Sequence, residues 1–326
     1  MSEYLLDIQN ERLSFFTPAG EVKALNDVSL QLKEGEVLGI VGESGSGKSV
    51  TAYSLMGLTA YPGRLIGGTI DFNGHRINDM TEKQMQHMRG NEVSIIFQDP
   101  MTSLNPVYTI GNQIREVILL HSKKTKKEAH ARAVELLTLV GINEPEKRLK
   151  QYPHELSGGM RQRVMIAIAL ACEPKLLIAD EPTTALDVTI QAQILELMMD
   201  LKNKIGMSII MITHDLGIVS NMCDKIAVMY AGKIVEVAEV CELFDHPAHP
   251  YTQGLIASFP SLYGEKTALK SIPGILPDMS KECPGCIFAP RCPYADERCY
   301  AQRPADVELG GIHRAACHRC KGGANG

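Results

Sequence analysis

The sequence predicts an α/β fold in which a parallel sheet is covered by helices on both faces. Short, wholly apolar runs recur along the chain, and amphipathic helical patterns such as residues 190–204 separate them. The apolar runs lie at residues 37–41, 176–179, 209–212 and 226–229. A strand of a parallel sheet is buried on both faces, so it reads as a continuous apolar run. We therefore expect the four runs to be strands of one core.

Two further segments predict antiparallel strands that are exposed on one face. Residues 25–32 and 68–72 alternate apolar and polar positions, and turn signals follow them at Glu34-Gly35 and Asn73-Gly74. Between about residues 105 and 160 the sequence is mostly helical. We expect this stretch to form a helical subdomain inserted into the α/β domain.

Length and composition bound the possible functions. The 326 residues suffice for one large domain, predicted at 1–245, and a smaller extension at 246–326, where recurring prolines interrupt regular elements. The last residues, 321–326, are expected to be disordered. The net charge of −5 gives no support for a nucleic-acid partner. The apolar runs are too short to span a bilayer and the N-terminus does not resemble a secretory signal, so we expect a cytoplasmic protein.

A phosphate-binding loop follows the first apolar run. Residues 42–49 read Gly-Glu-Ser-Gly-Ser-Gly-Lys-Ser, between a predicted strand and a predicted helix. Glycines let the backbone wrap so that its N–H groups face phosphates, while the lysine supplies a charge and the last serine a ligand for Mg²⁺. The predicted contacts to ATP and Mg²⁺ are Gly42, Ser44, Gly45, Ser46, Gly47, Lys48 and Ser49.

Two carboxylates end the apolar run at 176–179. Asp180 is expected to hold Mg²⁺ through water, and Glu181 is the candidate to polarise the water that attacks the phosphate. An Asp-Glu pair at a strand end is usually a helix cap or a surface pair. Because the chain also has a phosphate-binding loop, a role in a nucleotide site is the better interpretation of this pair.

A third phosphate-directed motif is the run Leu-Ser-Gly-Gly-Met at residues 156–160, followed by Arg-Gln-Arg. The Ser157 hydroxyl and the Gly158 and Gly159 amides are expected at the start of a helix, where the macrodipole favours an anion. This run resembles the signature of the ATP-binding-cassette (ABC) family. The resemblance implies a P-loop NTPase with a RecA-like parallel core, an antiparallel β subdomain and a helical signature subdomain. It also implies that Ser157 contacts a nucleotide held mainly by another subunit.

The same resemblance assigns roles to single residues. Gln98 matches the Q-loop glutamine, which senses Mg²⁺ and the γ-phosphate, and His214 matches the switch histidine that contacts that phosphate; both join Glu181 as catalytic residues. Asp187 matches the D-loop, which crosses the dimer interface. An aromatic near the N-terminus should stack on adenine, and Phe15 fits by spacing, with the adjacent phenylalanine as its rival.

The extension indicates one group of proteins within the family that the chain resembles. Residues 246–253, His-Pro-Ala-His-Pro-Tyr-Thr-Gln, and 288–293, Phe-Ala-Pro-Arg-Cys-Pro, resemble the tail of the D-type ATPase subunit of dipeptide and oligopeptide permeases. The resemblance implies an importer ATPase at the cytoplasmic face of the inner membrane. Its implied partners are a different, F-type ATPase subunit in a heterodimer, two integral membrane permease subunits and an extracytoplasmic solute-binding protein. Relatives with this tail also import nickel, glutathione or other small solutes, so the solute stays open.

Six of the nine cysteines lie between residues 283 and 320, and in a cytoplasmic chain this points to metal. Two Cys-x-x-Cys pairs could bind zinc tetrahedrally. Alternatively, four cysteines match the spacing of relatives that carry a 4Fe–4S cluster, which we favour because the Phe-x-Pro-Arg-Cys-Pro context accompanies it. Its expected role is to hold together a segment poor in apolar residues. The zinc set is Cys283, Cys286, Cys317 and Cys320, and the cluster set is Cys286, Cys292, Cys299 and Cys317.

Two other classes of function remain as alternatives. Soluble ABC proteins of translation or DNA repair usually fuse two cassettes or insert a long coiled coil, and the sequence shows neither. A scaffold with a degenerate site would not retain Lys48, Asp180, Glu181 and His214 together.

Overall fold

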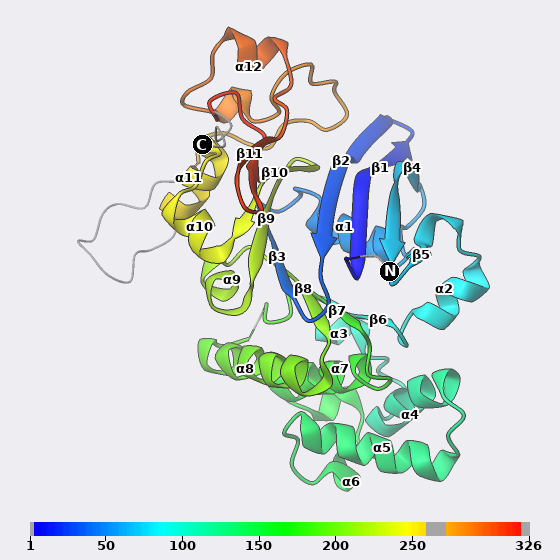
Figure 1. Ribbon diagram of the computed structural model, residues 1–326. Coiled ribbons are helices and arrows are strands. Elements are labelled where there is room, and N and C mark those ends of the chain that lie inside the picture. The colour runs from blue at the N-terminus through cyan, green and yellow to red at the C-terminus, as the bar shows by residue number, and fades with distance from the viewer. Residues whose placement is uncertain (1–2, 185, 259–271, 321–326) are drawn as a thin grey trace. The chain divides into compact units, whose positions relative to one another are not determined.

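The computed structural model describes residues 3–184, 186–258 and 272–320. The chain divides into two compact units, and the labels of Figure 1 mark the elements of each. The first unit comprises Met1–Leu32, Val37–Asn78 and Ile212–Gly326, and the second comprises Lys33–Glu36 and Asp79–Met211. The predicted disorder of residues 321–326 falls outside the described residues.

An antiparallel sheet opens the first unit. Its strands are β1 (Leu6–Thr17), β2 (Gly20–Leu32), β4 (Gly63–Phe72) and β5 (His75–Arg76), in the order β2-β1-β4-β5. The two predicted half-exposed strands are confirmed as parts of β2 and β4, and Asn73-Gly74 forms the predicted turn with φ of 49° and 78°. Strand β1 was not predicted, because register shifts after Ile8 break its alternation.

The first unit also contains parallel strands. All residues of β3 (Val37–Val41) and β9 (Lys225–Tyr230) are buried, and the two strands pair in parallel, as their apolar runs predict. Strand β10 (Lys233–Glu239) pairs antiparallel with β9. The extension adds β12 (His313–Ala315) to β10 and β11 (Val307–Gly310) to β12. Within the otherwise irregular extension, Gly310 and Gly311 thus permit a short hairpin at the edge of β10.

The first unit also contains helices, some of them in the extension. They are α1 (Lys48–Leu55), α9 (Leu216–Met222), α10 (Val240–Asp245), α11 (Pro250–Ala257) and α12 (Glu297–Ala301), with the short η3 (Ala289–Arg291). Tyr230 of β9, Tyr251 of α11 and Phe288 of the extension belong to one buried cluster. Their ring centroids lie 4.7 to 5.5 Å apart. The extension thus shares a core with the strands that precede it.

The second unit contains two of the predicted parallel strands and most of the long helices. Strands β6 (Val93–Ile96) and β7 (Leu176–Asp180) pair in parallel, and β8 (Ser208–Thr213) begins in this unit. The predicted helical stretch is confirmed. The helices are α2 (Glu82–Met88), α3 (Pro100–Ser103), α4 (Ile110–His121), α5 (Lys126–Leu139), α6 (Pro145–Arg148), α7 (Gly158–Ala169) and α8 (Val188–Ile205).

Side-chain caps set the starts of these helices. Thr109 caps α4, and Thr125 forms a capping box with Glu128 at α5. Ser157 and Asp187 cap α7 and α8 in the same way. Two residues that the sequence assigns to function therefore also begin helices.

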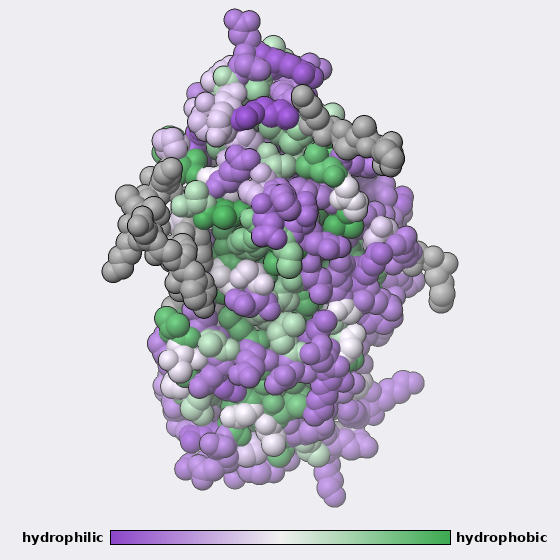
Figure 2. Space-filling model, turned by 60° about the vertical axis from the view of Figure 1, so that its left-hand side comes forward, coloured by the Kyte–Doolittle hydropathy of each residue, from purple (hydrophilic) through white to green (hydrophobic). Residues whose placement is uncertain are grey.

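Within the described ranges, no helix combines the length and the apolar character needed to cross a bilayer. Hydrophilic residues cover much of the face drawn in Figure 2, with smaller groups of hydrophobic residues between them.

Candidate nucleotide-binding site

The loop after β3 requires glycine at two positions. Gly42 has φ of 155°, and a Cβ there would lie 2.1 Å from the carbonyl oxygen of Met229 in β9. Gly47 has φ of 106°, and its Cβ would lie 2.8 Å from the Met229 methyl group. The loop packs so closely against β9 that a side chain at either position would push the loop away from the strand.

Lys48, the first residue of α1, is almost fully buried against this loop. Its Nζ donates hydrogen bonds to the carbonyl oxygens of Gly42 at 2.8 Å and Glu43 at 3.0 Å. The Ser46 hydroxyl is buried and has no hydrogen-bond partner in the described part of the chain. The N-cap of α1 is Gly47, which has no side chain to cap the first amides of the helix. A buried ammonium, an unsatisfied hydroxyl and a helix N-terminus together suit a bound phosphate.

Two other residues of the first unit, His214 and Phe15, are also predicted to contact ATP, and their surroundings say less about a bound nucleotide. His214 is exposed, directly after the end of β8. Phe15 and Phe16 are consecutive residues of β1, so they face opposite sides of the strand; Phe15 is half-buried, and Phe16 is 44% exposed. The guanidinium carbon of Arg64 lies 5.8 Å from the Phe16 ring centroid. The assignment of Phe15 to adenine stays a prediction.

In the second unit the structure joins two predicted catalytic residues. The Nε2 of Gln98 donates a hydrogen bond to Oε2 of Glu181 at 2.7 Å, and the Thr184 hydroxyl donates to the same oxygen at 3.0 Å. Glu181 follows β7 with φ of 47°, a left-handed conformation that non-glycine residues adopt rarely and often at functional sites. Asp180, the last residue of β7, is 2% exposed. The carboxylate of Glu181 is therefore oriented from two sides, and the contribution of Thr184 was missed from the sequence.

The signature residues lie at the start of α7, as predicted. The Ser157 hydroxyl accepts a hydrogen bond from the Met160 amide at 3.4 Å, and Gly158 and Gly159 form the first turn. A Cβ on Gly159 would lie 3.0 Å from Cγ2 of Ile190 in α8. The start of α8 is capped by Asp187, whose Oδ1 accepts from the Ile190 amide at 3.0 Å. The predicted signature and D-loop residues are thus neighbours within this unit.

The four cysteines of the predicted cluster influence one another. Burial, with smaller contributions from the neighbouring Cys299 and Cys317 thiols, raises the pKa of Cys286 to about 11. Burial also raises the pKa of Cys292 and of Cys299, with smaller contributions from Cys317 and Cys292 respectively. The Cys286 amide donates to the Cys299 carbonyl at 2.7 Å. Among the described residues, however, no group of three or more His, Cys, Asp or Glu side chains is arranged to hold a metal ion.

The two cysteines left over by the cluster set have separate surroundings. A hydrogen bond from Cys320 lowers the pKa of Cys317 to about 6 and raises that of Cys320. Cys283 instead lies in a loop, where its carbonyl accepts two hydrogen bonds from the Arg303 guanidinium at 3.1 and 3.0 Å.

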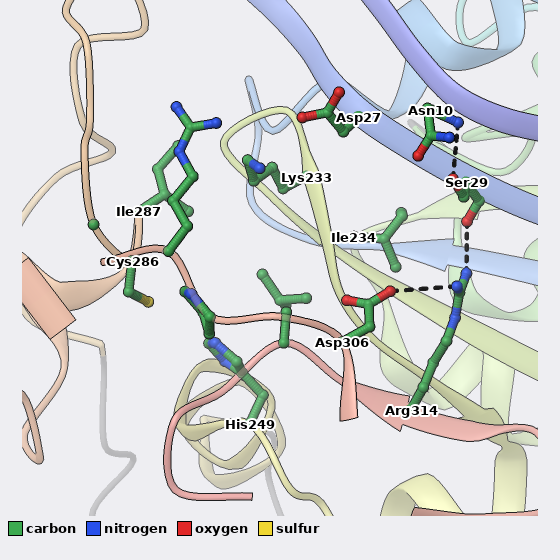
Figure 3. A pocket seen from close by; sticks show the side chains of 15 residues that line it. Asn10, Asp27, Ser29, Lys233, Ile234, His249, Cys286, Ile287, Asp306 and Arg314 are labelled. Carbon is green, nitrogen blue, oxygen red and sulfur yellow. Dashed lines mark hydrogen bonds and ion pairs between the residues drawn. The ribbon is translucent and has the colours of Figure 1, made fainter. Parts of the chain in front are cut away.

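A pocket of about 200 Å³ in the first unit lies apart from the predicted nucleotide contacts (Figure 3). Arg314 lies in its wall and donates to the Ser29 carbonyl at 2.8 Å and to Asp306 at 3.3 Å. Lys233 and Cys286 also line it. None of the residues predicted to contact ATP is part of its wall.

Comparisons with known proteins identify the family. The sequence model of the ABC transporter family matches residues 25–184, and that of the oligopeptide/dipeptide transporter C-terminal region matches residues 235–299. The chain is 49% identical over 314 residues to the dipeptide transport ATP-binding protein DppD of Escherichia coli, covering 96% of each chain. The chain belongs to the ABC transporter family. A second relative of this ABC protein is the oligopeptide transport ATP-binding protein OppD of Bacillus subtilis, 55% identical over 95% of this chain and 87% of the relative.

Solved structures agree with the ABC fold. A dimeric post-hydrolysis state of the ATP-binding cassette MJ0796 bound to ADP and phosphate superimposes with a TM-score of 0.65 at 26% identity, over 72% of this chain and 98% of that one. CbiO1 from Clostridium perfringens, part of an ABC transporter complex, gives 0.64 at 29% identity, over 75% and 92%. The predicted ABC ATPase fold is confirmed, and this ABC protein is an ATP-binding, ATP-hydrolysing enzyme.

Sequence reasoning missed one set of contacts around the phosphate-binding loop of this ABC protein. Glu43 contacts both Tyr251 and Arg291, although 208 and 248 positions separate it from these two residues. Tyr251 and Arg291 stand in the two motifs that identify the extension. Nothing in those motifs indicates what the side chains touch.

Proposed function

We propose that this ABC ATPase powers the uptake of dipeptides or oligopeptides. The observation that carries the proposal is the match of residues 235–299 to the oligopeptide/dipeptide transporter C-terminal region, together with the ABC match at 25–184. The relatives that align over nearly the whole chain are named for dipeptide or oligopeptide transport.

In this proposal the phosphates of ATP lie in the loop after β3. The backbone of Gly42, Ser44, Gly45, Ser46 and Gly47 surrounds them and Lys48 supplies the positive charge. Mg²⁺, when bound, neutralises charge on the phosphates, and the residues that would hold it are Ser49, Gln98 and Asp180. The buried Lys48 and the unsatisfied Ser46 hydroxyl fit this assignment.

Glu181 is the proposed base for the attacking water. Its carboxylate accepts hydrogen bonds from Gln98 and Thr184 at Oε2, and these bonds orient it. Gln98 would report the presence of Mg²⁺ and phosphate to this carboxylate. His214 would contact the γ-phosphate and Phe15 would stack on adenine.

The exposed start of α7 is proposed to serve a second nucleotide. Ser157, Gly158 and Gly159 would contact the γ-phosphate of ATP bound to a different, F-type ATPase subunit, and Asp187 would cross that interface. The two ATPases close while the γ-phosphate bridges them and reopen after hydrolysis. The shared use of two sites makes the heterodimer the active form.

Exposed apolar residues mark the surface proposed for the membrane subunits. Met101 is 62% exposed, Val107 71% and Tyr108 52%, all within a short stretch after Gln98. We propose that two integral membrane permease subunits dock here, which places the ATPase at the cytoplasmic face of the inner membrane, with an extracytoplasmic solute-binding protein on the other side. Residues 1–245 would be the nucleotide-binding domain and 246–326 its extension.

For the cysteines we propose a 4Fe–4S cluster held by the thiolates of Cys286, Cys292, Cys299 and Cys317. Their mutual effect on pKa supports a common location. Because the described residues form no ready metal site, the four thiols must come closer to one another to hold the cluster. When bound, the cluster would cross-link the extension.

Single substitutions separate the cluster from zinc. Cys292→Ser should remove iron and sulfide from an anaerobically purified protein, whereas Cys283→Ser should leave both at a ratio near one. Zinc held by the two Cys-x-x-Cys pairs predicts the reverse: a colourless protein that loses zinc with Cys283→Ser and keeps it with Cys292→Ser.

The function is tested in the transporter purified from membranes and placed in vesicles. Glu181→Gln should retain ATP binding and abolish both hydrolysis and dipeptide uptake, while Glu196→Gln, on the exposed face of α8, should change neither. Dipeptide uptake that survives Glu181→Gln would refute the mechanism. Uptake of nickel or glutathione in place of peptides would refute the assignment of peptides as the substrate.

A further inference from the structure

We propose that the C-terminal extension positions the phosphate-binding loop: Arg291 and Tyr251 hold Glu43, the second residue of the loop, in its ATP-binding conformation. We call these three residues the Glu43 clamp. The inference rests on the phosphate role proposed for the loop. It gives the extension a part in ATP binding, in addition to any part in holding metal.

The first contact of the Glu43 clamp is a bidentate ion pair. Arg291 donates from Nη1 and Nη2 to the two carboxylate oxygens of Glu43 at 2.8 and 3.0 Å. The remaining donors of the guanidinium are also used: Nε bonds to the Pro273 carbonyl at 2.8 Å, Nη2 to the Ile272 carbonyl at 3.2 Å and Nη1 to the Tyr230 hydroxyl at 3.3 Å. Arg291 is only 9% exposed. Its guanidinium is therefore fixed in place and imposes its geometry on the carboxylate.

The second contact is to the backbone. The Glu43 amide donates a hydrogen bond to the Tyr251 hydroxyl at 2.9 Å. The Glu43 carbonyl in turn accepts from Lys48 Nζ at 3.0 Å and from the Ser46 amide at 3.2 Å. Glu43 thus connects the extension to two residues proposed to bind phosphate. A shift of Glu43 would move the partners of both.

The clamp is anchored in a rigid part of the unit. Tyr251 is fully buried, with its ring centroid 4.7 Å from that of Tyr230 and 5.5 Å from that of Phe288. Its helix, α11, is capped by His249, whose Nδ1 accepts from the Tyr251 amide at 3.0 Å. Packed aromatic rings have few alternative rotamers. The tyrosine hydroxyl is therefore a fixed reference point for a glycine-rich loop that has little stiffness of its own.

The position of Glu43 explains why a clamp is useful. A loop that samples several conformations binds ATP with an affinity reduced by the fraction of time it spends in the competent one. Holding one residue through its amide, carbonyl and side chain restricts the loop before ATP arrives. The benefit should appear in ATP affinity rather than in the rate of the chemical step.

The test measures equilibrium ATP binding by the full-length chain with Mg²⁺, for the wild type, Arg291→Ala, Arg291→Lys and the matched control Arg298→Ala. Arg298 lies in the same extension but is exposed. Arg291→Ala should weaken ATP binding about tenfold, equivalent to about 1.4 kcal/mol. Arg291→Lys, which keeps the charge but not the bidentate geometry, should give an intermediate loss, and Arg298→Ala none.

A role through Glu43 is separated from a general loss of structure by a double-mutant cycle. Glu43→Gln should also weaken ATP binding. Adding Arg291→Ala to it should reduce the affinity for ATP little further, because both changes break the same ion pair. In the transporter, Arg291→Ala should raise the KM for ATP with little change in kcat. Iron content and thermal midpoint, measured in parallel, show whether the variant keeps its metal and its fold.

Two results would overturn the clamp: wild-type ATP affinity in folded Arg291→Ala, or full additivity of the two substitutions. If Arg291→Ala does not fold, Tyr251→Phe decides the question. It removes only the hydroxyl, so it should weaken ATP binding by a smaller factor, and unchanged affinity would refute the clamp. Lys48→Ala tests the underlying loop assignment, since normal ATP binding by that variant would refute the loop's role and not the clamp alone.

Discussion

A buried carboxyl group in β1 should make the stability of this protein depend on pH. Glu11 is 0% exposed, and neither of its carboxylate oxygens has a hydrogen-bond partner among the described residues. Burial raises the pKa of Glu11 from 4.5 to about 7, and the nearby Ser54 hydroxyl opposes this rise. Ser54 belongs to α1, the helix that follows the phosphate-binding loop, where its hydroxyl donates to the Thr51 carbonyl at 2.8 Å.

The size of the effect follows from the two pKa values. Between pH 4.5 and 7 the folded protein binds more protons at Glu11 than the unfolded chain does, so the free energy of unfolding falls as pH rises. A difference of about 2.5 pKa units corresponds to about 3 kcal/mol in total. About 2.5 kcal/mol of this loss falls between pH 5 and pH 8. Glu11→Gln removes the titration and should avoid the loss.

The assay is urea unfolding of both proteins at pH 5, 6, 7 and 8. Far-UV circular dichroism is the suitable probe because the chain contains no tryptophan. The free energy of unfolding of Glu11→Gln, relative to wild type, should increase by about 2.5 kcal/mol from pH 5 to pH 8. Glu34→Gln, at an exposed glutamate, should show no such trend. If the difference in free energy of unfolding between Glu11→Gln and wild type stays constant over this range, Glu11 does not titrate in the way described.

Two further predictions concern the nucleotide site. Gly42→Ala should reduce ATP affinity at least tenfold in equilibrium binding, because its Cβ would collide with the Met229 carbonyl, whereas Gly20→Ala, at positive φ but with no neighbour within 4 Å, should bind ATP normally; equal affinities would contradict the packing described for the loop. Asp187→Ala should lower the free energy of unfolding by about 1 kcal/mol in urea titrations by removing the cap of α8, and Asp187→Asn should keep it. If Asn destabilises as much as Ala, the capping bond to the Ile190 amide is not what holds the helix end.

The local motifs of this chain were readable because each depends on residues close together in sequence. Strand β3, the loop and the start of α1 occupy one continuous stretch, so apolar run, glycines and lysine could be recognised together. The same holds for Ser157 at the start of α7, where one hydroxyl and the next amides make the cap. In each case the physical cause is a backbone conformation that acts over a few residues.

Contacts between distant segments could not be read in this way. Gln98 and Glu181 were assigned separately, and only the structure joins them and adds Thr184 to the same carboxylate. The cysteine spacings allowed two metal sets, because spacing does not say which thiols face one another. The prolines of the extension suggested an irregular segment, yet β11 and β12 pair beside β10, since the open edge of that strand supplies the hydrogen bonds they need.

The motifs of the chain were enough to identify an ABC ATPase with an extension of the peptide-transporter kind, because those signals are local and ordered along the chain. The residues that the extension contacts became visible only in the folded protein. Glu43 and Arg291 form a partly buried ion pair across 248 positions, and no motif around either residue predicts it. Packing of the extension against β9 brings the two together, and packing of that kind depends on the whole fold.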